Sequence, residues 1–170
     1  MKELYIIRHA KSSWSNPSLN DFDRGLKKRG KDDIAFMAKW LKTRVETPDL
    51  ILSSPAKRAK KTLKAIKKEF EVNEKDILFD ERIYEASLDD LLEILTSLKS
   101  DKKIVFLIGH NPSLNELAEF LSGVYLTNIP TSGIVGLRFD TDKWSDLSSQ
   151  KGKIIFFEYP KKLRGEISCE

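Results

Sequence analysis

The 170-residue sequence contains one cysteine, two histidines and no long apolar run. Cys169 stands next to the last residue and has no partner for an internal disulfide, which is typical of a reducing cytoplasm. No segment approaches the roughly 20 apolar residues of a membrane span, and residues 1–8 do not resemble a signal peptide. One cysteine and two histidines are too few ligands for an ordinary zinc site. We therefore predict a cytoplasmic protein with no membrane association, no metal and no cofactor.

Basic residues are in slight excess, with a net charge of +4, so a nucleic-acid partner has to be considered. The densest basic run lies between residues 57 and 68, where lysines recur at helical spacing. The same run carries an apolar stripe, and no aromatic residue that could stack on a base interrupts the lysines. We interpret it as the solvated face of an amphipathic helix and expect no nucleic-acid partner.

Strand-like and helix-like patterns alternate along the chain. The expected strands are 3–8, 49–53, 77–79, 103–108, 133–139 and 153–159, and the expected helices are 29–46, 55–70, 88–99 and 112–122. This alternation predicts a three-layer α/β/α sandwich with a mostly parallel central sheet. No helix separates the last two strands, so we expect them to form a hairpin and to give the sheet an antiparallel edge. We predict a single domain over residues 1–160 and a polar tail over 161–170.

The starts of three helices can be read from local sequence. Ser54-Pro55 and Asn111-Pro112 have the pattern of a helix N-cap followed by proline at the first helical position. Ser87, followed three residues later by Asp90, has the pattern of a capping box.

Both histidines follow buried strands directly. His9 comes after Arg8 at the end of the first strand, and His110 follows the strand over 103–108. Arg58 is expected in the first turn of the helix after the second strand, and Arg24 lies in the loop after the first. Ligands bind at the carboxyl ends of strands in an open α/β sheet, so we expect these side chains to converge there.

Two imidazoles among guanidinium groups and helix N-termini suit a phosphoryl group. Guanidinium groups bind phosphate oxygens in pairs and keep their charge at any working pH, and helix N-termini add N–H donors. A neutral imidazole is a competent nucleophile, and nearby arginines oppose its protonation. The residues thus predict phosphoryl chemistry that depends largely on electrostatic stabilisation.

The segments 8–12, 53–59 and 109–112 resemble, in the right order, the signature blocks of the histidine phosphatase (phosphoglycerate mutase-like) superfamily. Segments 23–30 and 131–134 support the resemblance, which covers nearly the whole chain. Within the superfamily, the sequence is most similar to the short phosphohistidine phosphatases of SixA type. The resemblance implies that His9 is a nucleophile that is transiently phosphorylated.

The resemblance also implies the roles of the surrounding side chains. Arg8, Arg58 and His110 would complete the phosphate pocket. Arg24 would be an additional phosphate contact. More peripheral substrate-binding positions would be Asn111, Ser132 and Gly133.

Some departures from the superfamily pattern point away from a mutase. Ala10 and Lys11 stand where mutase-like members usually have glycine and glutamate. Between the second and third blocks, only residues 70–103 connect the expected helix to the expected strand, so a minimal cap and an open site are expected. Glu85 lies where larger relatives place an acidic proton donor, and a solvated loop glutamate is an equal alternative.

We therefore predict a metal-independent phosphatase with a phosphohistidine intermediate on His9. Its expected substrates are phosphoproteins carrying phosphohistidine, with free phosphate as product. The alternatives are a phosphomonoesterase of small phosphate esters and a catalytically silent phosphate-binding module. The sequence does not fix the oligomeric state.

Overall fold

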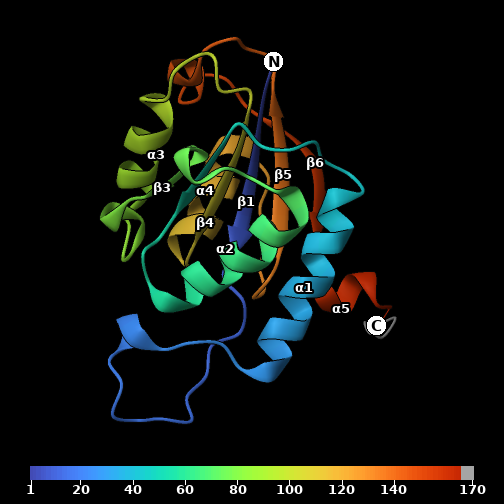
Figure 1. The fold of residues 1–170 in the computed structure, drawn as a ribbon. Helices are drawn as coiled ribbons and strands as arrows, with labels where there is room; N and C mark the ends of the chain where they lie inside the picture. Colours follow the sequence, from blue (N-terminus) through green and yellow to red (C-terminus); the bar gives the residue numbers. More distant parts are fainter. Residues whose placement is uncertain (166–170) are drawn as a thin grey trace.

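The computed structural model describes residues 1–165, so Cys169 and the end of the predicted tail lie outside it. A six-stranded sheet forms its centre, in the order β3-β2-β4-β1-β5-β6 (Figure 1). The strands are β1 (Lys2–Arg8), β2 (Leu50–Ser53), β3 (Ile77–Phe79), β4 (Ile104–Gly109), β5 (Ile134–Phe139) and β6 (Lys153–Glu158). These bounds agree with the expected strands to within one residue at each end.

The predicted hairpin of the last two strands is confirmed. β5 runs antiparallel to both β1 and β6, while β1, β2, β3 and β4 pair in parallel. The antiparallel strand therefore lies one place in from the edge of the sheet, and β6 forms the edge itself. The parallel strands bring their carboxyl ends to one side of the sheet, as expected.

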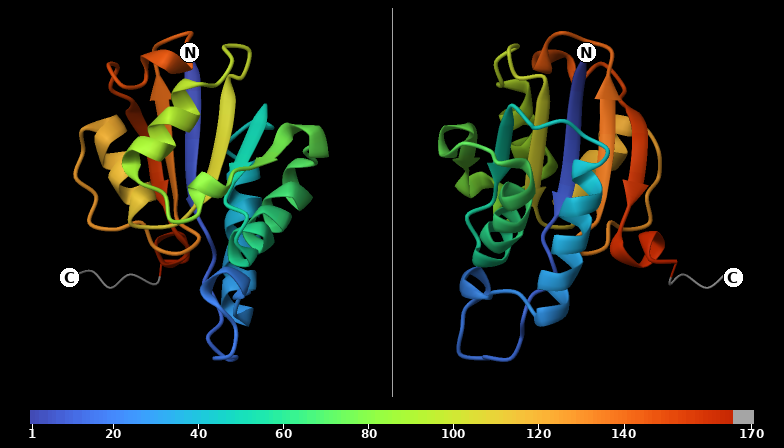
Figure 2. Two further views of the ribbon diagram at one scale, coloured as in Figure 1. Left: turned by 90° about the vertical axis from the view of Figure 1, so that its left-hand side faces the viewer. Right: turned by 45° about the vertical axis from the view of Figure 1, so that its right-hand side comes forward.

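Helices cover both faces of the sheet, as predicted for a three-layer sandwich (Figure 2). The helices are α1 (Lys28–Lys42), α2 (Lys57–Phe70), α3 (Leu88–Thr96), α4 (Ser113–Ser122) and the short α5 (Pro160–Leu163). α1 and α2 pack on one face, and α3 and α4 pack on the other. Among residues 1–165, no helix has the length and apolar content needed to cross a membrane.

Two apolar cores form, one on each face of the sheet. Neighbouring strand residues point to opposite faces, so Ile6 packs with α3 and α4 while Ile7 packs with α1 and α2. Because helices cover both faces, β1 and β4 are apolar at consecutive positions rather than at alternate ones. Apolar packing on both faces of the sheet therefore holds β1 and β4, which lead directly to the two histidines, in place.

Two of the predicted helix starts are wrong, by two residues for α2 and by one residue for α4. α2 begins at Lys57 with Ala56 as its N-cap, and α4 begins at Ser113 with Pro112 as its N-cap. Ser54 does not cap a helix with Pro55, because its N–H continues the sheet by donating to the Ile108 carbonyl. The capping box of Ser87 and Asp90 is confirmed, with both hydrogen bonds present.

The predicted boundary between domain and tail falls inside α5. Arg164 directly follows this helix, and its guanidinium forms an ion pair with Asp33 of α1. A single domain over residues 1–160 stays a prediction.

Candidate active site

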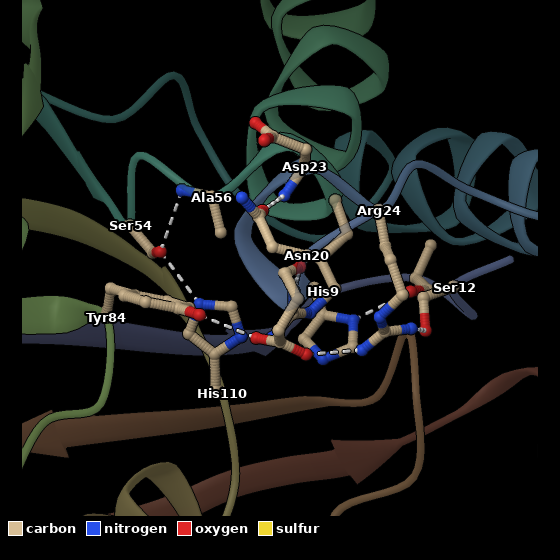
Figure 3. Close-up of polar contacts among 12 residues, drawn as sticks. His9, Ser12, Asn20, Asp23, Arg24, Ser54, Ala56, Tyr84 and His110 are labelled. Atoms are coloured by element: carbon tan, nitrogen blue, oxygen red, sulfur yellow. Dashed lines mark hydrogen bonds and ion pairs between the residues drawn. The ribbon is translucent and has the colours of Figure 1, made fainter. Parts of the chain in front are cut away.

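The two histidines meet at the carboxyl ends of neighbouring strands. Arg8 is in register with Gly109 across the β1–β4 pair, so the residue after each strand, His9 or His110, occupies an equivalent place. The His9 N–H donates to the Gly109 carbonyl at 3.0 Å. The two ring centroids are 5.0 Å apart, and both residues are 7% exposed. Figure 3 shows the rings together, with Tyr84 beyond His110 and Arg24 beyond His9.

The His9 ring is held in one orientation by its own main chain. Its Nδ1 lies 2.7 Å from the Ala10 carbonyl oxygen, which can only accept a hydrogen bond. Nδ1 therefore carries the proton, and Nε2 is left with a free lone pair. The Ala10 N–H in turn donates to the Thr62 hydroxyl of α2 at 2.9 Å. The sequence alone did not indicate this support from Ala10 and Thr62.

The pKa of His9 is well suited to a nucleophile. Burial lowers it to about 4, and the neighbouring guanidinium groups add to the effect. The ring is then neutral at pH 7, and the lone pair of Nε2 is available to attack an electrophile.

His110 is oriented by a hydroxyl rather than by the main chain. Its Nε2 lies 2.7 Å from the Ser54 Oγ, which also accepts the Ala56 N–H at 3.2 Å. If the Ser54 hydroxyl donates its hydrogen to Nε2, the ring proton lies on Nδ1, whereas in the other tautomer Nε2–H donates to the Ser54 Oγ. That Nδ1 is buried and has no hydrogen-bond partner within residues 1–165. Burial, and next the His9 ring, lowers the pKa of His110 to about 3.

Three guanidinium groups surround the histidines. Arg8 donates to the Ile129 carbonyl at 2.8 Å, and Arg24 donates to the Ser12 hydroxyl at 2.6 Å. Arg58, in the first turn of α2, donates to the Asp21 carbonyl at 2.8 Å. The Nε atoms of all three arginines are buried without an acceptor in the described part of the chain. Several guanidinium N–H groups are therefore free to donate to the oxygens of a bound anion such as a phosphoryl group.

Asp21 supplies a negative charge to two of these guanidinium groups, and no sequence pattern indicated this contact. Its carboxylate bridges Arg24 at 2.6 Å and Arg58 at 3.0 Å and also accepts the Tyr84 hydroxyl at 2.7 Å. Arg24, followed by Tyr84 and Arg58, holds the pKa of this carboxyl well below its usual range. Asp21 belongs to a 3-10 turn (Asp21–Asp23) in the loop between β1 and α1, and its side chain is 49% exposed. An exposed carboxylate thus lies on the arginines that a phosphoryl group would need.

The same loop forms an aromatic rim. The Arg24 guanidinium lies 3.6 Å from the centroid of the Trp14 ring, which is 71% exposed. Phe22 packs edge-on against Tyr84 with 5.2 Å between centroids. A cleft of about 230 Å³ opens between Trp14, Asn16, Pro17, Leu19, Asp21 and Arg24. The site is therefore open on this side, in line with the minimal cap expected from the sequence.

The three peripheral candidates lie next to the site and support its main chain. The Ser132 N–H donates to the His9 carbonyl at 3.1 Å, and the Arg8 N–H donates to the Gly133 carbonyl at 3.0 Å. The Asn111 amide donates to the Ile129 carbonyl at 3.0 Å, the same oxygen that accepts from Arg8. The Ser132 hydroxyl is buried without a partner in residues 1–165. The structure thus places all three where they hold the ends of β1 and β4.

Glu85 is exposed and does not share the hydrogen bond that its neighbour Tyr84 makes. Its φ is +57°, in the left-handed region, and its carboxylate forms no ion pair or hydrogen bond with residues 1–165. Tyr84, one residue earlier, contacts Asp21 and packs edge-on against His110 with 5.6 Å between centroids. The role of Glu85 as a proton donor stays a prediction.

No metal site is apparent in the described part of the chain, where no three His, Cys, Asp or Glu side chains lie close enough to hold an ion. The chemistry that these side chains can supply is nucleophilic attack by an imidazole beside a cluster of positive donors.

The sequence and the fold are both similar to known proteins. Residues 4–103 match the family described as the histidine phosphatase superfamily (branch 1). An uncharacterised chloroplastic protein of Arabidopsis thaliana is 31% identical over 89% of this chain and 72% of its own length. An uncharacterised protein of Mycobacterium leprae is 28% identical over 91% of this chain and all of its own length.

Solved structures share the fold over nearly the whole chain. A protein of Agrobacterium tumefaciens, provisionally assigned as the phosphohistidine phosphatase SixA, has a TM-score of 0.81 and 30% identity, covering 94% of this chain and 98% of its own. The protein histidine phosphatase SixA complexed with tungstate has a TM-score of 0.81 and 24% identity, covering 95% and 99%.

Proposed function

The chain belongs to the histidine phosphatase superfamily, and on this premise we propose that it hydrolyses phosphohistidine in proteins through a phosphorylated His9, without a metal ion. The observation that carries the proposal is the orientation of the His9 ring. Because Nδ1 donates to the Ala10 carbonyl, the Nε2 lone pair is free beside the three guanidinium groups.

In the first proposed step, Nε2 of His9 attacks phosphorus as the bond between phosphorus and the substrate imidazole breaks. The leaving imidazole takes its proton from water. In the second step, water attacks the phosphorus of phospho-His9, the P–Nε2 bond breaks, and free phosphate leaves. The equatorial oxygens carry most of the charge in a loose transition state. Arg8, Arg58 and the Nδ1–H of His110 would stabilise them, and Arg24 would add a further donor.

The state of Glu85 supports a phosphohistidine rather than an alkyl phosphate. An alkoxide leaving group needs a positioned acid, and no hydrogen bond or ion pair within residues 1–165 positions the exposed Glu85 carboxylate. An imidazole leaves more readily and depends less on such an acid. The assigned name of the Agrobacterium tumefaciens relative points in the same direction. A cytoplasmic location stays a prediction from the sequence.

A substrate panel tests this proposal. We expect the kcat/KM for a protein phosphorylated on histidine to exceed that for sugar phosphates and nucleoside monophosphates by at least about 100-fold, with EDTA present throughout. A higher kcat/KM for a phosphate ester would instead identify a small-molecule phosphomonoesterase. Loss of activity in EDTA, restored by a divalent cation, would contradict the metal-free mechanism.

A further inference from the structure

A groove with basic sides and an apolar floor runs between α1 and α2, which lie side by side on one face of the sheet (Figure 1). Its volume is about 630 Å³. Leu26, Ile34 and Ala65 contribute apolar lining, and Lys31, Lys61, Lys64 and Lys68 are among the lysines that line it. The catalytic site does not use any of these side chains.

The charge of these lysines is not neutralised by the domain. Within residues 1–165, Lys31, Lys61, Lys64 and Lys68 form no ion pair, whereas Lys67 pairs with Glu74 and Lys28 pairs with Asp32. Like charges on neighbouring helical turns repel one another and destabilise a helix slightly. An acidic ligand would remove this repulsion while burying the apolar floor.

The groove is lined by the same two chain segments that carry Arg24 and Arg58 of the phosphate pocket. Leu26 follows Arg24 by two residues, and α2 carries both Arg58 in its first turn and the lysines of the groove. The Lys57 side chain packs against Gly25 and so links α2 to the loop that carries Arg24. A Cβ placed on Gly25 would lie 3.6 Å from the Lys57 Cε. A chain whose phosphorylated residue lies between Arg24 and Arg58 can therefore continue directly into the groove.

We propose that this groove, with Lys31, Lys61, Lys64 and Lys68 along its sides, binds an acidic segment that flanks the phosphorylated residue of the protein substrate. The inference rests on the proposed function. Acidic side chains would pair with the lysines, and an interspersed apolar side chain would cover Leu26 and Ala65. A nucleic acid fits less well, because no aromatic residue for base stacking lines the groove in the described part of the chain.

The helix geometry sets the spacing of the acidic residues. Lys61 and Lys68 lie about 4.5 and 15 Å beyond Arg58 at a rise of about 1.5 Å per helical residue. An extended peptide covers about 3.3 Å per residue. The acidic residues are therefore expected within about five positions of the phosphorylated residue.

Two synthetic peptides test the groove. Each carries one histidine phosphorylated with phosphoramidate, flanked within five positions by glutamates in one peptide and by glutamines in the other. We expect the wild type to hydrolyse the glutamate peptide with a kcat/KM at least about tenfold higher, a preference that fades at 1 M salt. The K61E/K64E/K68E variant should lose or reverse this preference. The matched K99E/K103E/K143E variant changes the net charge equally at exposed lysines outside the groove and should keep it.

Free phosphohistidine separates the failure of this inference from the failure of the proposed function. All three proteins should hydrolyse it equally, because it does not reach the groove. If the wild type hydrolyses neither free phosphohistidine nor either peptide, the proposed function is wrong. If the wild type hydrolyses it but shows no preference between the peptides, or if both variants keep the preference, the groove is not a docking site. Binding of duplex DNA that depends on Lys61, Lys64 and Lys68 and is tighter than binding of the glutamate peptide would also overturn the proposal.

Discussion

His9 and His110, on the floor of the site, are 7% exposed and are fixed by the Ala10 carbonyl and the Ser54 hydroxyl. Asp21 and Trp14, on the rim, belong to the loop between β1 and α1 and are largely exposed. The floor is anchored in two parallel strands and one helix, whereas the rim is joined to it through ion pairs and the Tyr84 hydroxyl. We therefore propose that the floor supplies the chemistry and that the rim controls access to it.

The largest effect is expected on the floor, from His9→Ala. Removing the nucleophile should lower kcat by about 10⁴-fold or more, as for other enzymes that lose a nucleophile. Asp23→Asn is a suitable comparison, because Asp23 is exposed in the same loop region and forms no ion pair with residues 1–165. Steady-state kinetics on phosphohistidine measures both variants. Near-normal turnover by His9→Ala would show that His9 is not the nucleophile.

His110→Ala should have the next largest effect. Losing one preorganised donor to the phosphoryl oxygens typically costs about 10²–10³-fold in kcat. Single-turnover kinetics should show that both the phosphorylation of His9 and its hydrolysis are slowed. An unchanged rate for either step would show that Nδ1 does not contact the transferring group in that step.

Ser54→Ala tests how the floor is oriented. Without the hydroxyl, the His110 ring loses its partner at Nε2, so we expect kcat to fall by about tenfold, or roughly 1.4 kcal/mol. The double variant with His110→Ala should be no slower than His110→Ala alone, because Ser54 acts through that ring. Additive losses would mean that Ser54 contributes independently, for example by holding the Ala56 N–H.

The depressed pKa of His9 predicts an unusual pH profile. A neutral ring is required for attack, so kcat/KM should stay level as pH falls through 6.5 and should decline only near pH 4. A normal histidine would already lose activity near pH 6.5. A pH profile of kcat/KM on an acid-stable aryl phosphate distinguishes the two, and a midpoint near 6.5 would contradict the neutral, buried ring.

The smallest effect is expected on the rim, from Asp21→Asn. The carboxylate competes with a phosphoryl group for Arg24 and Arg58, so removing its charge should tighten tungstate or phosphate binding by about three- to tenfold. The inhibition constant measures this effect, with Asp23→Asn as the matched control. Weaker oxyanion binding would show instead that Asp21 positions the arginines.

The floor could be predicted from the sequence, whereas most of the rim could not. Arg8 ends an apolar strand, and His9 and His110 directly follow apolar strands, so local pattern alone places them at the same edge of the sheet. Asp21 lies in a loop without periodicity, and its partners Arg58 and Tyr84 are distant in sequence. The packing of α2 against the 3-10 turn brings Arg58 to Asp21, and the segment after a second 3-10 turn (Glu81–Ile83) brings Tyr84 there.

The helix cap expected at Ser54 and the proton donor expected at Glu85 also depend on contacts that local sequence does not reveal. Ser54 has the sequence pattern of a helix cap, but its N–H completes the sheet and its hydroxyl contacts His110. Glu85 stands in the expected region with a left-handed backbone, but its carboxylate forms no hydrogen bond or ion pair within residues 1–165, whereas the Tyr84 hydroxyl contacts Asp21. Tertiary hydrogen bonds and single backbone angles decide such details, and neither leaves a pattern in the sequence.

The central claim is that Nε2 of His9 carries the phosphoryl group between the two steps. The most direct measurement is rapid quenching of the enzyme with ³²P-labelled substrate, followed by peptide mapping. The account predicts an acid-labile, alkali-stable phosphate on His9 that forms and decays within one turnover and is absent in His9→Ala. Burst kinetics without label on His9, or label on another residue, would contradict it.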